Sequence, residues 1–339
     1  MLFKVFLLVS HLLFVWCRNI TSIVSTVNLT TNQTSHNITS SRSKSKKNES
    51  NVEKVVSNKP EDVKVVACVI LKDEDSYVDE WIHYNKYLGF NQIQIYDNSD
   101  KGSAKIAYLP QKYGDFVRVV HMPGKSKQKV AYADCGKRYV KEKYWAAFFD
   151  VDEFIVLRVH ASIQTLIHSL MPHGGALSIF RVFFGSNHHT RYEDKPVLSR
   201  FTRRRNDTDV YVKTIAYLPD TVSYEAHSVI VRNGTHVVDC HGNIMKPGRV
   251  PKPRETHEDV AAIYHYKLKS LEEYRLKRLR GDVDVPKRGD LYKGPDGESV
   301  IKHEFLRYDK GSYALKDTVA LDFFEGRKKE VKDFPPVSS

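Results

Sequence analysis

The feature that most constrains this chain is an apolar run that three carboxylates interrupt. The run reads Phe148-Phe-Asp-Val-Asp-Glu-Phe-Ile155, and its apolar residues predict a buried strand over residues 144–157. Burying an unpaired carboxylate costs several kcal/mol, so such a cluster needs a counter-charge, either a basic neighbour or a divalent cation. A third interpretation is an incidental acidic loop on a solvated turn.

Side chains alternate along a strand, so Asp150 and Asp152 are expected to point the same way and Glu153 to the opposite face. Two carboxylates on one face can hold Mg²⁺ or Mn²⁺, and such an ion in turn binds a diphosphate. We therefore interpret the Asp-x-Asp pair as a candidate metal and phosphate site.

The composition indicates a globular protein with an anionic ligand. The chain has 339 residues, 41% of them hydrophobic, and a formal net charge of +12. A positive charge alone does not separate nucleic acid, phosphosugar and membrane headgroup. Because no helix-turn-helix, zinc-finger or RNA-recognition signature accompanies the basic residues, we expect no nucleic-acid partner and favour small anions.

The cysteines exclude two classes of scaffold. Cys17, Cys68, Cys135 and Cys240 lack Cys-x-x-Cys spacing, which argues against structural zinc and against a disulfide-dense fold. In an oxidising lumen, one bridge among Cys68, Cys135 and Cys240 is open, and the sequence does not choose the pair.

Residues 1–18 predict a signal anchor or a signal peptide. The segment is apolar from Leu2 to Cys17 except for Lys4, Ser10 and His11, and it falls just short of the roughly 17 to 25 residues of a spanning helix. Its poor small-residue cleavage pattern favours an uncleaved anchor. We expect a single-pass type II protein of the Golgi or ER membrane with a luminal catalytic domain, and secretion is the alternative.

Residues 19–60 predict a disordered, glycosylated stem. The segment is rich in Ser, Thr, Asn and Lys and has no hydrophobic periodicity, so it cannot bury enough surface to fold. The chain carries the glycosylation pattern Asn-x-Ser/Thr in the stem and twice in the body, at Asn19, Asn28, Asn32, Asn37, Asn48, Asn206 and Asn233. A plain polar linker without glycans is the alternative.

The body alternates apolar strands with helical patterns, which predicts a mostly parallel sheet covered by helices. Strands are expected over residues 63–71, 92–97, 116–121, 144–157, 175–184 and 261–266, with further strands between 210 and 240. Helices are expected after Tyr77, over residues 128–141 and 162–170, and from Ser270, whose capping box with Glu273 precedes a stop at Gly281.

Short motifs in this body follow an order typical of one enzyme family. They are Lys72-Asp73-Glu74, Trp81, Leu88-Gly89-Phe90, Ile95-Tyr96-Asp97-Asn98, Gln128, Asp134-Cys135, Trp145, Phe149 to Ile155, Phe184-Gly185, His265-Tyr266, Lys269-Ser270 and Glu273. Over residues 64–282 the chain resembles glycosyltransferase family 92 and its close family 2-like relatives. It departs at Asp73, where relatives typically have Asn, and in Val182 to Gly185, where they often have Trp ahead of Phe-Gly.

The resemblance implies a GT-A fold over residues 61–285, with 286–339 as a C-terminal extension. It also implies metal-dependent, inverting transfer of a hexose, often galactose, from a UDP-sugar to a hydroxyl of a glycan or glycoprotein acceptor. The Mn²⁺ or Mg²⁺ ligands would be Asp150, Asp152 and His265, with Asp152 the best direct ligand and Asp150 on the ribose or the ion's water shell. A satisfied core histidine is the alternative for His265.

Further candidates for contact with the donor leave strand ends or begin helices, where an open α/β sheet binds its ligands. They are Lys72, Glu74, Asp97, Asn98, Gln128, Asp134, Asp150, Lys213 and His227. We expect the turns after residues 71, 97 and 149 to lie along one rim of the sheet. A solvated polar turn is the alternative for the first two of them.

Inverting transfer requires a general base, for which Asp or Glu usually serves. The candidates are Glu193, Asp194, Glu225 and Asp239, among which the sequence does not choose. A catalytically inactive protein that binds a glycan or a nucleotide-sugar is the alternative function. A hydrolase fits poorly, because Asp150 and Asp152 are too close in sequence to flank a glycosidic bond.

Overall fold

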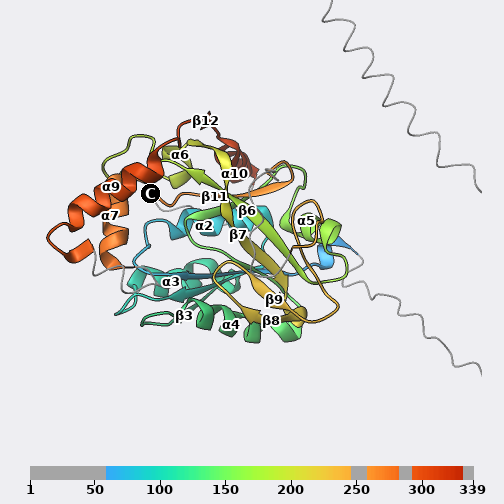
Figure 1. Cartoon of the computed structure of the whole chain (residues 1–339). Coiled ribbons are helices and arrows are strands. Elements are labelled where there is room, and N and C mark those ends of the chain that lie inside the picture. Colours follow the sequence, from blue (N-terminus) through green and yellow to red (C-terminus); the bar gives the residue numbers. More distant parts are fainter. Residues whose placement is uncertain (1–58, 246–257, 282–291, 331–339) are drawn as a thin grey trace, which may run out of the picture. The chain divides into compact units, whose positions relative to one another are not determined.

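The structure is a computed structural model that describes residues 59–245, 258–281 and 292–330. Its main sheet has the strand order β3-β2-β1-β4-β7-β6-β11-β5, with β10 beside β6 and β12 beside β7, while β8 and β9 form a separate ribbon (Figure 1). The strands are β1 (Val65–Leu71), β2 (Gln92–Asp97), β3 (Val117–His121), β4 (Trp145–Phe148), β5 (Glu153–Leu157), β6 (Ala176–Phe184), β7 (Arg203–Tyr217), β8 (Thr221–Tyr224), β9 (Val229–Val231), β10 (Val237–Val238), β11 (Ala261–His265) and β12 (Leu315–Lys316).

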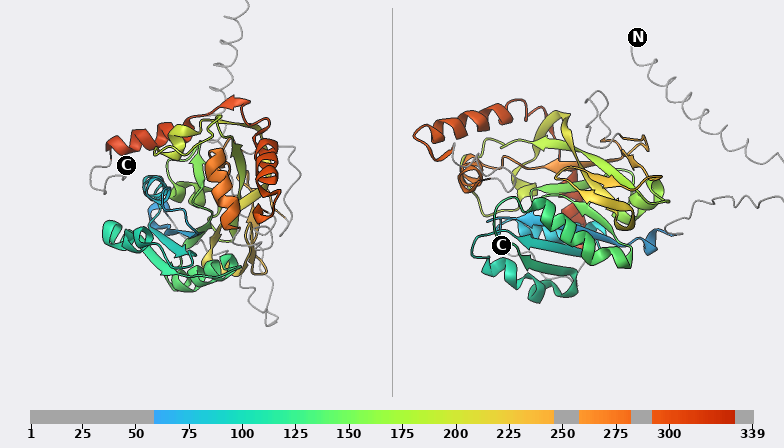
Figure 2. Two further views of the ribbon diagram at one scale, coloured as in Figure 1. Left: turned by 90° about the vertical axis from the view of Figure 1, so that its left-hand side faces the viewer. Right: turned by 60° about the horizontal axis from the view of Figure 1, so that its bottom comes forward.

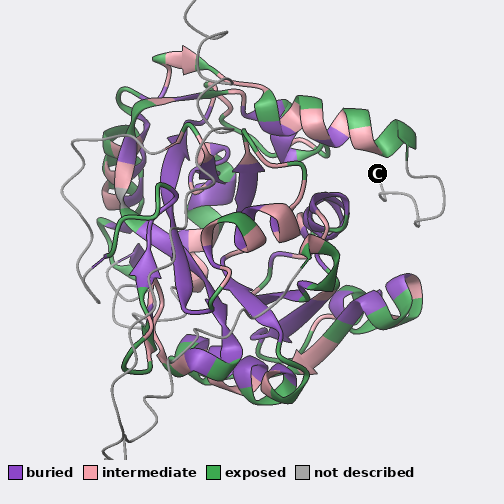
Figure 3. Cartoon of the chain, turned by 90° about the vertical axis from the view of Figure 1, so that its right-hand side faces the viewer, coloured by how far each residue is buried: buried purple, intermediate pink, exposed green. Residues whose placement is uncertain are grey.

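Helices cover the sheet on both faces. They are α2 (Val78–Leu88), α3 (Ala104–Tyr113), α4 (Gln128–Tyr139), α5 (Ile163–Leu170), α6 (Val197–Arg200), α7 (Leu271–Arg280), α9 (Gly297–Asp309) and α10 (Val319–Glu330). Four 3₁₀ turns are also described, η1 (Pro60–Asp62), η2 (Gly114–Phe116), η3 (Val140–Glu142) and η4 (Leu218–Asp220). The central strands are buried between these layers, whereas β3, β8 and β12 are partly exposed, as are the outer helix faces (Figure 3).

Strand β1 explains why this half of the sheet has two covered faces. Every residue from Val65 to Leu71 is buried, as predicted for a parallel strand. Val65 and Val69 belong to the core that contains Trp81 of α2, whereas Val66 and Cys68 belong to the core beneath α4. The alternating side chains of one strand therefore fix one helix on each face.

The sheet is parallel only in part. Strands β3, β2, β1 and β4 are parallel, as predicted, and so are β6 and β11. Strand β7 runs antiparallel to both β4 and β6, and β5 runs antiparallel to β11. The prediction of a mostly parallel sheet is confirmed, with antiparallel pairs at β7, β5 and β12.

The expected continuous strand over residues 144–157 is wrong. It is two strands, β4 near the sheet centre and β5 at its edge, joined by a turn in which the backbone N–H of Glu153 donates to the carbonyl of Asp150 over 3.0 Å. Strand alternation therefore does not apply to the acidic residues. A turn lets each carboxylate reach its own polar partners, which a regular strand would not.

The helix α7 follows its sequence signals closely. The Ser270 hydroxyl accepts the N–H of Glu273, the Glu273 carboxylate accepts the N–H of Ser270, and Gly281 is the C-cap. Helices α3, α9 and α10 were not predicted. Helix α9 packs beside α7 (Figure 2), and β12 pairs with β7, so the described part of residues 286–339 packs onto the body.

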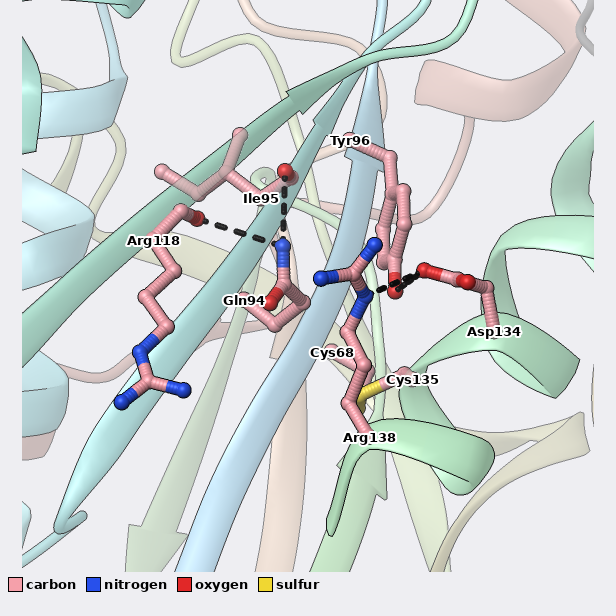
Figure 4. Close-up of a disulfide and its surroundings, with 8 residues drawn as sticks. All are labelled: Cys68, Gln94, Ile95, Tyr96, Arg118, Asp134, Cys135 and Arg138. Carbon is pink, nitrogen blue, oxygen red and sulfur yellow. Dashed lines mark hydrogen bonds and ion pairs between the residues drawn. A yellow bond between two sulfur atoms is a disulfide. The ribbon is translucent and has the colours of Figure 1, made fainter.

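Cys68 and Cys135 form a disulfide, which resolves the choice that the sequence left open, and Cys240 is a buried free thiol. The bridge joins β1 to α4, and both cysteines are fully buried. Beside it, Asp134 accepts hydrogen bonds from Tyr96 and Arg138 (Figure 4). Helix α4 is therefore tied covalently to the centre of the sheet.

The predicted anchor, residues 1–18, and nearly all of the predicted stem lie outside the described residues. Within residues 59–245, 258–281 and 292–330, no helix combines the length and apolar character that crossing a bilayer requires. The two glycosylation patterns of the body fall on Asn206 and Asn233, and both side chains are exposed.

We expect the double variant Cys68→Ala, Cys135→Ala to lose about 4 kcal/mol of unfolding free energy, because the bridge closes a long loop in the unfolded chain. Urea unfolding measures the loss, and peptide mapping without reductant should recover the Cys68–Cys135 link. Cys240→Ala is the control and should leave that link intact. A map that joins Cys240 to either partner would contradict the assignment.

Candidate functional site

The turn of residues 150–153, here called the acidic turn, lies where β4 leaves the sheet and β5 begins. The side chains of Asp152 and Glu153 are buried, with 2% and 0% of their surface exposed. The backbone N–H of Tyr266 donates to the carbonyl of Asp152 over 2.8 Å, and the Trp81 indole of α2 donates to the carbonyl of Glu153 over 2.9 Å. Neighbouring elements thus hold the turn by its backbone and leave its carboxylates to other partners.

Lys213 of β7 holds one end of the acidic turn. Its ammonium lies 2.8 Å from Asp150 and 3.3 Å from Glu153. Gln128, the first residue of α4, donates to Asp150 over 3.4 Å. Burial alone would lower the pKa of Lys213, but the two carboxylates outweigh it and raise the pKa above its ordinary value. Lys213 is therefore a fixed positive charge in the core.

Glu153 faces the same charged cluster as its neighbours, so the expectation that it turns away is wrong. Its carboxylate accepts the backbone N–H of Asp150 over 2.9 Å and a hydrogen bond from Arg181 over 3.2 Å. Burial raises the pKa of Glu153 to about 7, against the opposing effect of Lys213.

Asp152 binds a different set of basic groups. Its carboxylate lies 2.5 Å from the ammonium of Lys277 and 3.7 Å from that of Lys269. The imidazole Nε2 of His265 also lies 3.7 Å away. Burial alone would raise the pKa of Asp152, but Lys277, Lys269 and His265 outweigh it and hold the pKa well below the ordinary value. Asp152 is therefore ionised.

His265 ends β11 beside Asp152 and is a neutral imidazole. Burial, together with the nearby Arg181 guanidinium, lowers its pKa well below the ordinary value. Its buried Nδ1 has no hydrogen-bond partner among the described residues. A neutral imidazole is the form that binds a metal ion.

We asked whether these residues fit a divalent cation. In the described ranges, no three His, Cys, Asp or Glu side chains are grouped as metal ligands. An ionised Asp152 beside a neutral His265 does fit in chemistry, because Mg²⁺-type sites take one or two protein carboxylates and complete their shell with phosphate and water. Asp150 contacts Lys213 and Gln128. The other interpretation of the acidic run, in which basic neighbours supply the counter-charge, also holds, because Lys213, Lys269 and Lys277 pair with its carboxylates.

A pocket of about 480 Å³ is lined by Lys269 and Lys277, the two lysines that bind Asp152. We call it the cationic pocket after its four basic side chains; the charged side chains that line it are Lys267, Lys269, Lys277, Arg280, Asp73, Glu74, Glu272 and Glu273. Arg280 pairs with Glu74 at 2.9 Å, and Lys269 lies over the ring of Tyr77 at 4.3 Å. Burial and the neighbouring cations Arg278 and Lys277 lower the pKa of Lys267 to about 8.

Of the donor contacts predicted after the first two strands, one lines the cationic pocket and three do not. Glu74 lines the cationic pocket, whereas Lys72 pairs with Asp100 at 3.0 Å. Asp97 accepts two backbone N–H groups of the following turn, and Asn98 donates to the carbonyls of Met122 and Gly124. Asp97 and Asn98 therefore shape the loops at this edge of the sheet.

Asp134 and His227 lie apart from the cationic pocket. Asp134 contacts Tyr96 and Arg138 on the side of α4 shown in Figure 4. The His227 ring lies 4.9 Å from that of Tyr211, and burial together with Lys213 and Arg181 lowers its pKa to about 4.

None of the four candidate bases lines the cationic pocket. Glu193 pairs with His189 and Lys195 at the surface, and Asp194 is exposed beside Tyr192. Glu225 pairs with Lys129, while Asp239 accepts hydrogen bonds from its own turn.

Sequence reasoning missed most of the cations in this site. They are Arg181, Lys267, Lys277 and Arg280, and Lys269 was noted only as part of a motif. A signal was present: Lys267 and Lys269 alternate after His265, and Lys277 and Arg280 are three residues apart on one helix face. The partners of these cations are distant in sequence, so spacing alone did not assign them.

Comparison with known proteins identifies the family. The sequence profile of glycosyltransferase family 92 matches residues 63–284, more than half of the chain. This chain therefore belongs to glycosyltransferase family 92, as the motifs suggested, and that membership supports a glycosyltransferase.

Individual relatives match over shorter stretches. A family 92 protein of Oryza sativa subsp. japonica is 27% identical over 140 residues, covering 40% of this chain and 24% of that protein. One of Arabidopsis thaliana is 35% identical over 97 residues, covering 28% and 17%. The chain thus spans a quarter or less of the length of these relatives. Among solved structures, S. aureus TarS aligns over 73% of this chain and 43% of its own at 12% identity, with a TM-score of only 0.32.

We expect Lys213→Met to destabilise the protein by about 3–5 kcal/mol, because it leaves Asp150 and Glu153 without their shared buried cation. Chemical unfolding measures the change. Lys129→Met is the matched control: Lys129 also pairs with a carboxylate, Glu225, but at the surface, where a pair contributes at most about 1 kcal/mol. Equal losses in the two variants would contradict the importance of the buried cluster.

Proposed function

We propose that this protein is a metal-dependent inverting glycosyltransferase that moves a hexose, galactose being the first candidate, from a UDP-sugar to a hydroxyl of a glycan or glycoprotein. The observation that carries the proposal is the ionised, buried Asp152 beside neutral His265, bound to Lys269 and Lys277, which line an adjoining pocket. Membership in glycosyltransferase family 92 supports the reaction class.

The cationic pocket suits the diphosphate of such a donor. Lys269 and Lys277 present ammonium groups that already bind one carboxylate, and phosphate oxygens offer the same type of acceptor. Buried positive charges attract an anion strongly, because the surrounding protein screens them less than water does. The pocket's volume of about 480 Å³ is in the range of small-molecule sites.

Each residue of the site has a role under this proposal. Asp152 and His265 would hold Mn²⁺ or Mg²⁺, and the bound ion supplies Lewis-acid neutralisation of the charge that develops on departing UDP. Lys269 and Lys277 bind and orient the phosphates, and Glu74 fixes Arg280 at the pocket wall. Lys213 and Gln128 hold Asp150, which keeps the turn in place.

For the compartment, we propose the lumen of the ER or Golgi, with residues 1–18 as a type II membrane anchor. A buried disulfide between core elements supports an oxidising compartment, and the exposed Asn206 and Asn233 are compatible with glycosylation. Secretion after cleavage is the alternative.

The test of the function is release of UDP by the purified luminal protein from a panel of UDP-hexoses, with Mn²⁺ and with a chelator. We expect Asp152→Asn to lower this release by about 10²–10³-fold, because it removes a full charge from the reacting site. Glu298→Gln is the control: it removes an exposed carboxylate that pairs with Arg275 on the surface. Thermal unfolding checks that both variants fold.

The outcomes separate the alternatives. Release that stops with chelator and in Asp152→Asn supports the proposal. Release that continues with chelator but stops in Asp152→Asn means that Lys269 and Lys277, and not a metal ion, neutralise the charge on departing UDP. Normal release in Asp152→Asn rejects the site, and an absence of release with every donor, while UDP still binds, favours the inactive binding protein.

Binding of UDP should weaken as pH rises through about 8. Lys267 lines the pocket with a pKa of about 8, so it is charged below that pH and neutral above it, and only the charged form attracts the diphosphate. We expect the affinity to fall about three- to tenfold between pH 7 and 9, the effect of one lost charge contact. Calorimetric titration of UDP measures it. Lys267→Arg should remove the dependence, and an unchanged slope would exclude Lys267 as its cause.

A further inference from the structure

A second pocket, of about 250 Å³, shares Lys267 with the cationic pocket. We call it the tyrosine pocket. It lies on β6, β7 and α9, and the residues used below are Arg181, Phe183, Asp209, Tyr211, Lys267 and Tyr308. No sequence motif pointed to it.

The acidic turn is linked to both pockets through side chains that line them. Asp152 contacts Lys277 and Lys269 of the cationic pocket, as described above. Glu153 accepts a hydrogen bond from Arg181 of the tyrosine pocket over 3.2 Å, and the ring of His265 lies 5.7 Å from that of Phe183. A ligand in either pocket is therefore separated from the acidic turn by a single side chain.

The walls of the tyrosine pocket combine three aromatic rings, of which that of Tyr211 is exposed, with charged side chains. Tyr211 is 46% exposed, and its ring lies 5.2 Å from the Arg181 guanidinium. Phe183 stacks on Tyr308 at 6.0 Å, and the Lys267 ammonium lies over Tyr308 at 4.1 Å. Such rings pack against the C–H face of a sugar, while neighbouring polar groups bind its hydroxyls.

Both arginines of this pocket are paired with carboxylates. Arg181 pairs with Asp209 as well as with Glu153, and Arg205 pairs with Asp207. The cationic pocket is lined by Lys267, Lys269, Lys277 and Arg280 and also by the carboxylates of Asp73, Glu74, Glu272 and Glu273. Because both arginines of the tyrosine pocket are already paired with carboxylates, a neutral, hydroxyl-bearing ligand suits this pocket.

Asp209 and Asp207 differ in position. The Asp209 side chain is 20% exposed and binds Arg181, which links it to Glu153 and the acidic turn. The Asp207 side chain is 59% exposed and binds Arg205 at the surface. The β6–β7 register shifts on both sides of Val182, an irregularity of the kind that redirects side chains near functional sites.

We propose that the tyrosine pocket is the acceptor subsite, that it takes a neutral terminal hexose of a glycan, and that Asp209 is the catalytic base. This inference rests on the proposed function. The acceptor oxygen bonds to the anomeric carbon of the donor hexose, and the bond from that carbon to the phosphate oxygen breaks with its electron pair leaving on UDP. The hydroxyl proton moves to the Asp209 carboxylate.

The binding test uses neutral methyl hexosides, namely methyl galactoside, glucoside and mannoside, with methyl glucuronide as the acidic comparison. Saturation-transfer NMR on the UDP-loaded protein reports binding without needing turnover. We expect at least one neutral hexoside to bind and Tyr211→Ala to weaken it at least about tenfold, the loss of one aromatic contact. Binding of UDP should stay unchanged, because Tyr211 does not line the cationic pocket.

The kinetic test uses transfer to the hexoside that binds. Asp209→Asn should lower kcat by about 10²–10⁴-fold, the range for loss of a general base, with little change in KM. Glu298→Gln, which removes an exposed carboxylate outside both pockets, is the control and should stay within about threefold of the wild type. Circular dichroism and thermal unfolding check the fold, and Tyr211→Ala keeps the subsite testable if Asp209→Asn does not fold.

The results distinguish the two proposals. A wild-type protein that does not bind UDP rejects the proposed function. Hexoside binding that is unchanged in Tyr211→Ala, or stronger binding of the glucuronide, overturns the subsite. Full transfer activity in Asp209→Asn overturns its role as base, even where the subsite stands.

Discussion

The structure depends on how two buried carboxylates and a third, partly exposed one are neutralised in one turn. Asp150, Asp152 and Glu153 lie where the chain leaves the centre of the sheet and returns to its edge. Buried carboxylates without partners would unfold a domain of ordinary stability, so the elements that supply the partners are constrained in place. Lys213 comes from β7, Arg181 from β6, and Lys277 from α7. The charge requirement of one turn therefore joins the parallel half of the sheet to its mixed half and to a helix beyond it.

The disulfide serves the same turn from the other face. Gln128 reaches Asp150 only if the start of α4 is held against the sheet, and the Cys68–Cys135 bridge fixes that helix to β1. On the opposite face, Trp81 of α2 donates to the carbonyl of Glu153. Each face of the sheet thus contributes a rigid helix to the turn, which keeps carboxylates with strong mutual repulsion within one small region. This is the kind of support that a precisely positioned site requires.

The sequence predicted the parallel strands and the helices α2 and α4 well, because their patterns are local, whereas α3 between β2 and β3 was not predicted. The buried run of β1 and the capping box of Ser270 with Glu273 need no distant partner to be recognised. The acidic run was assigned to one strand because its apolar residues dominate the pattern, and the cost of placing adjacent carboxylates on a strand was not weighed. For the site, Asp152 and His265 were found as a pair and do meet. Their cations were missed because Lys277 and Arg181 reach the turn only through tertiary structure.

The balance of charge around the turn bears on what the site is for. A purely structural cluster tends towards neutrality, since each surplus buried charge costs free energy. Here Lys213, Arg181, Lys269 and Lys277 surround three carboxylates, and burial raises the pKa of Glu153 to about 7, so that it is partly protonated at neutral pH. Arg181 is also paired with Asp209, whereas Lys269 and Lys277 line the cationic pocket. The ammonium groups that neutralise Asp152 therefore lie at a pocket wall as well, where two of them can bind a diphosphate together.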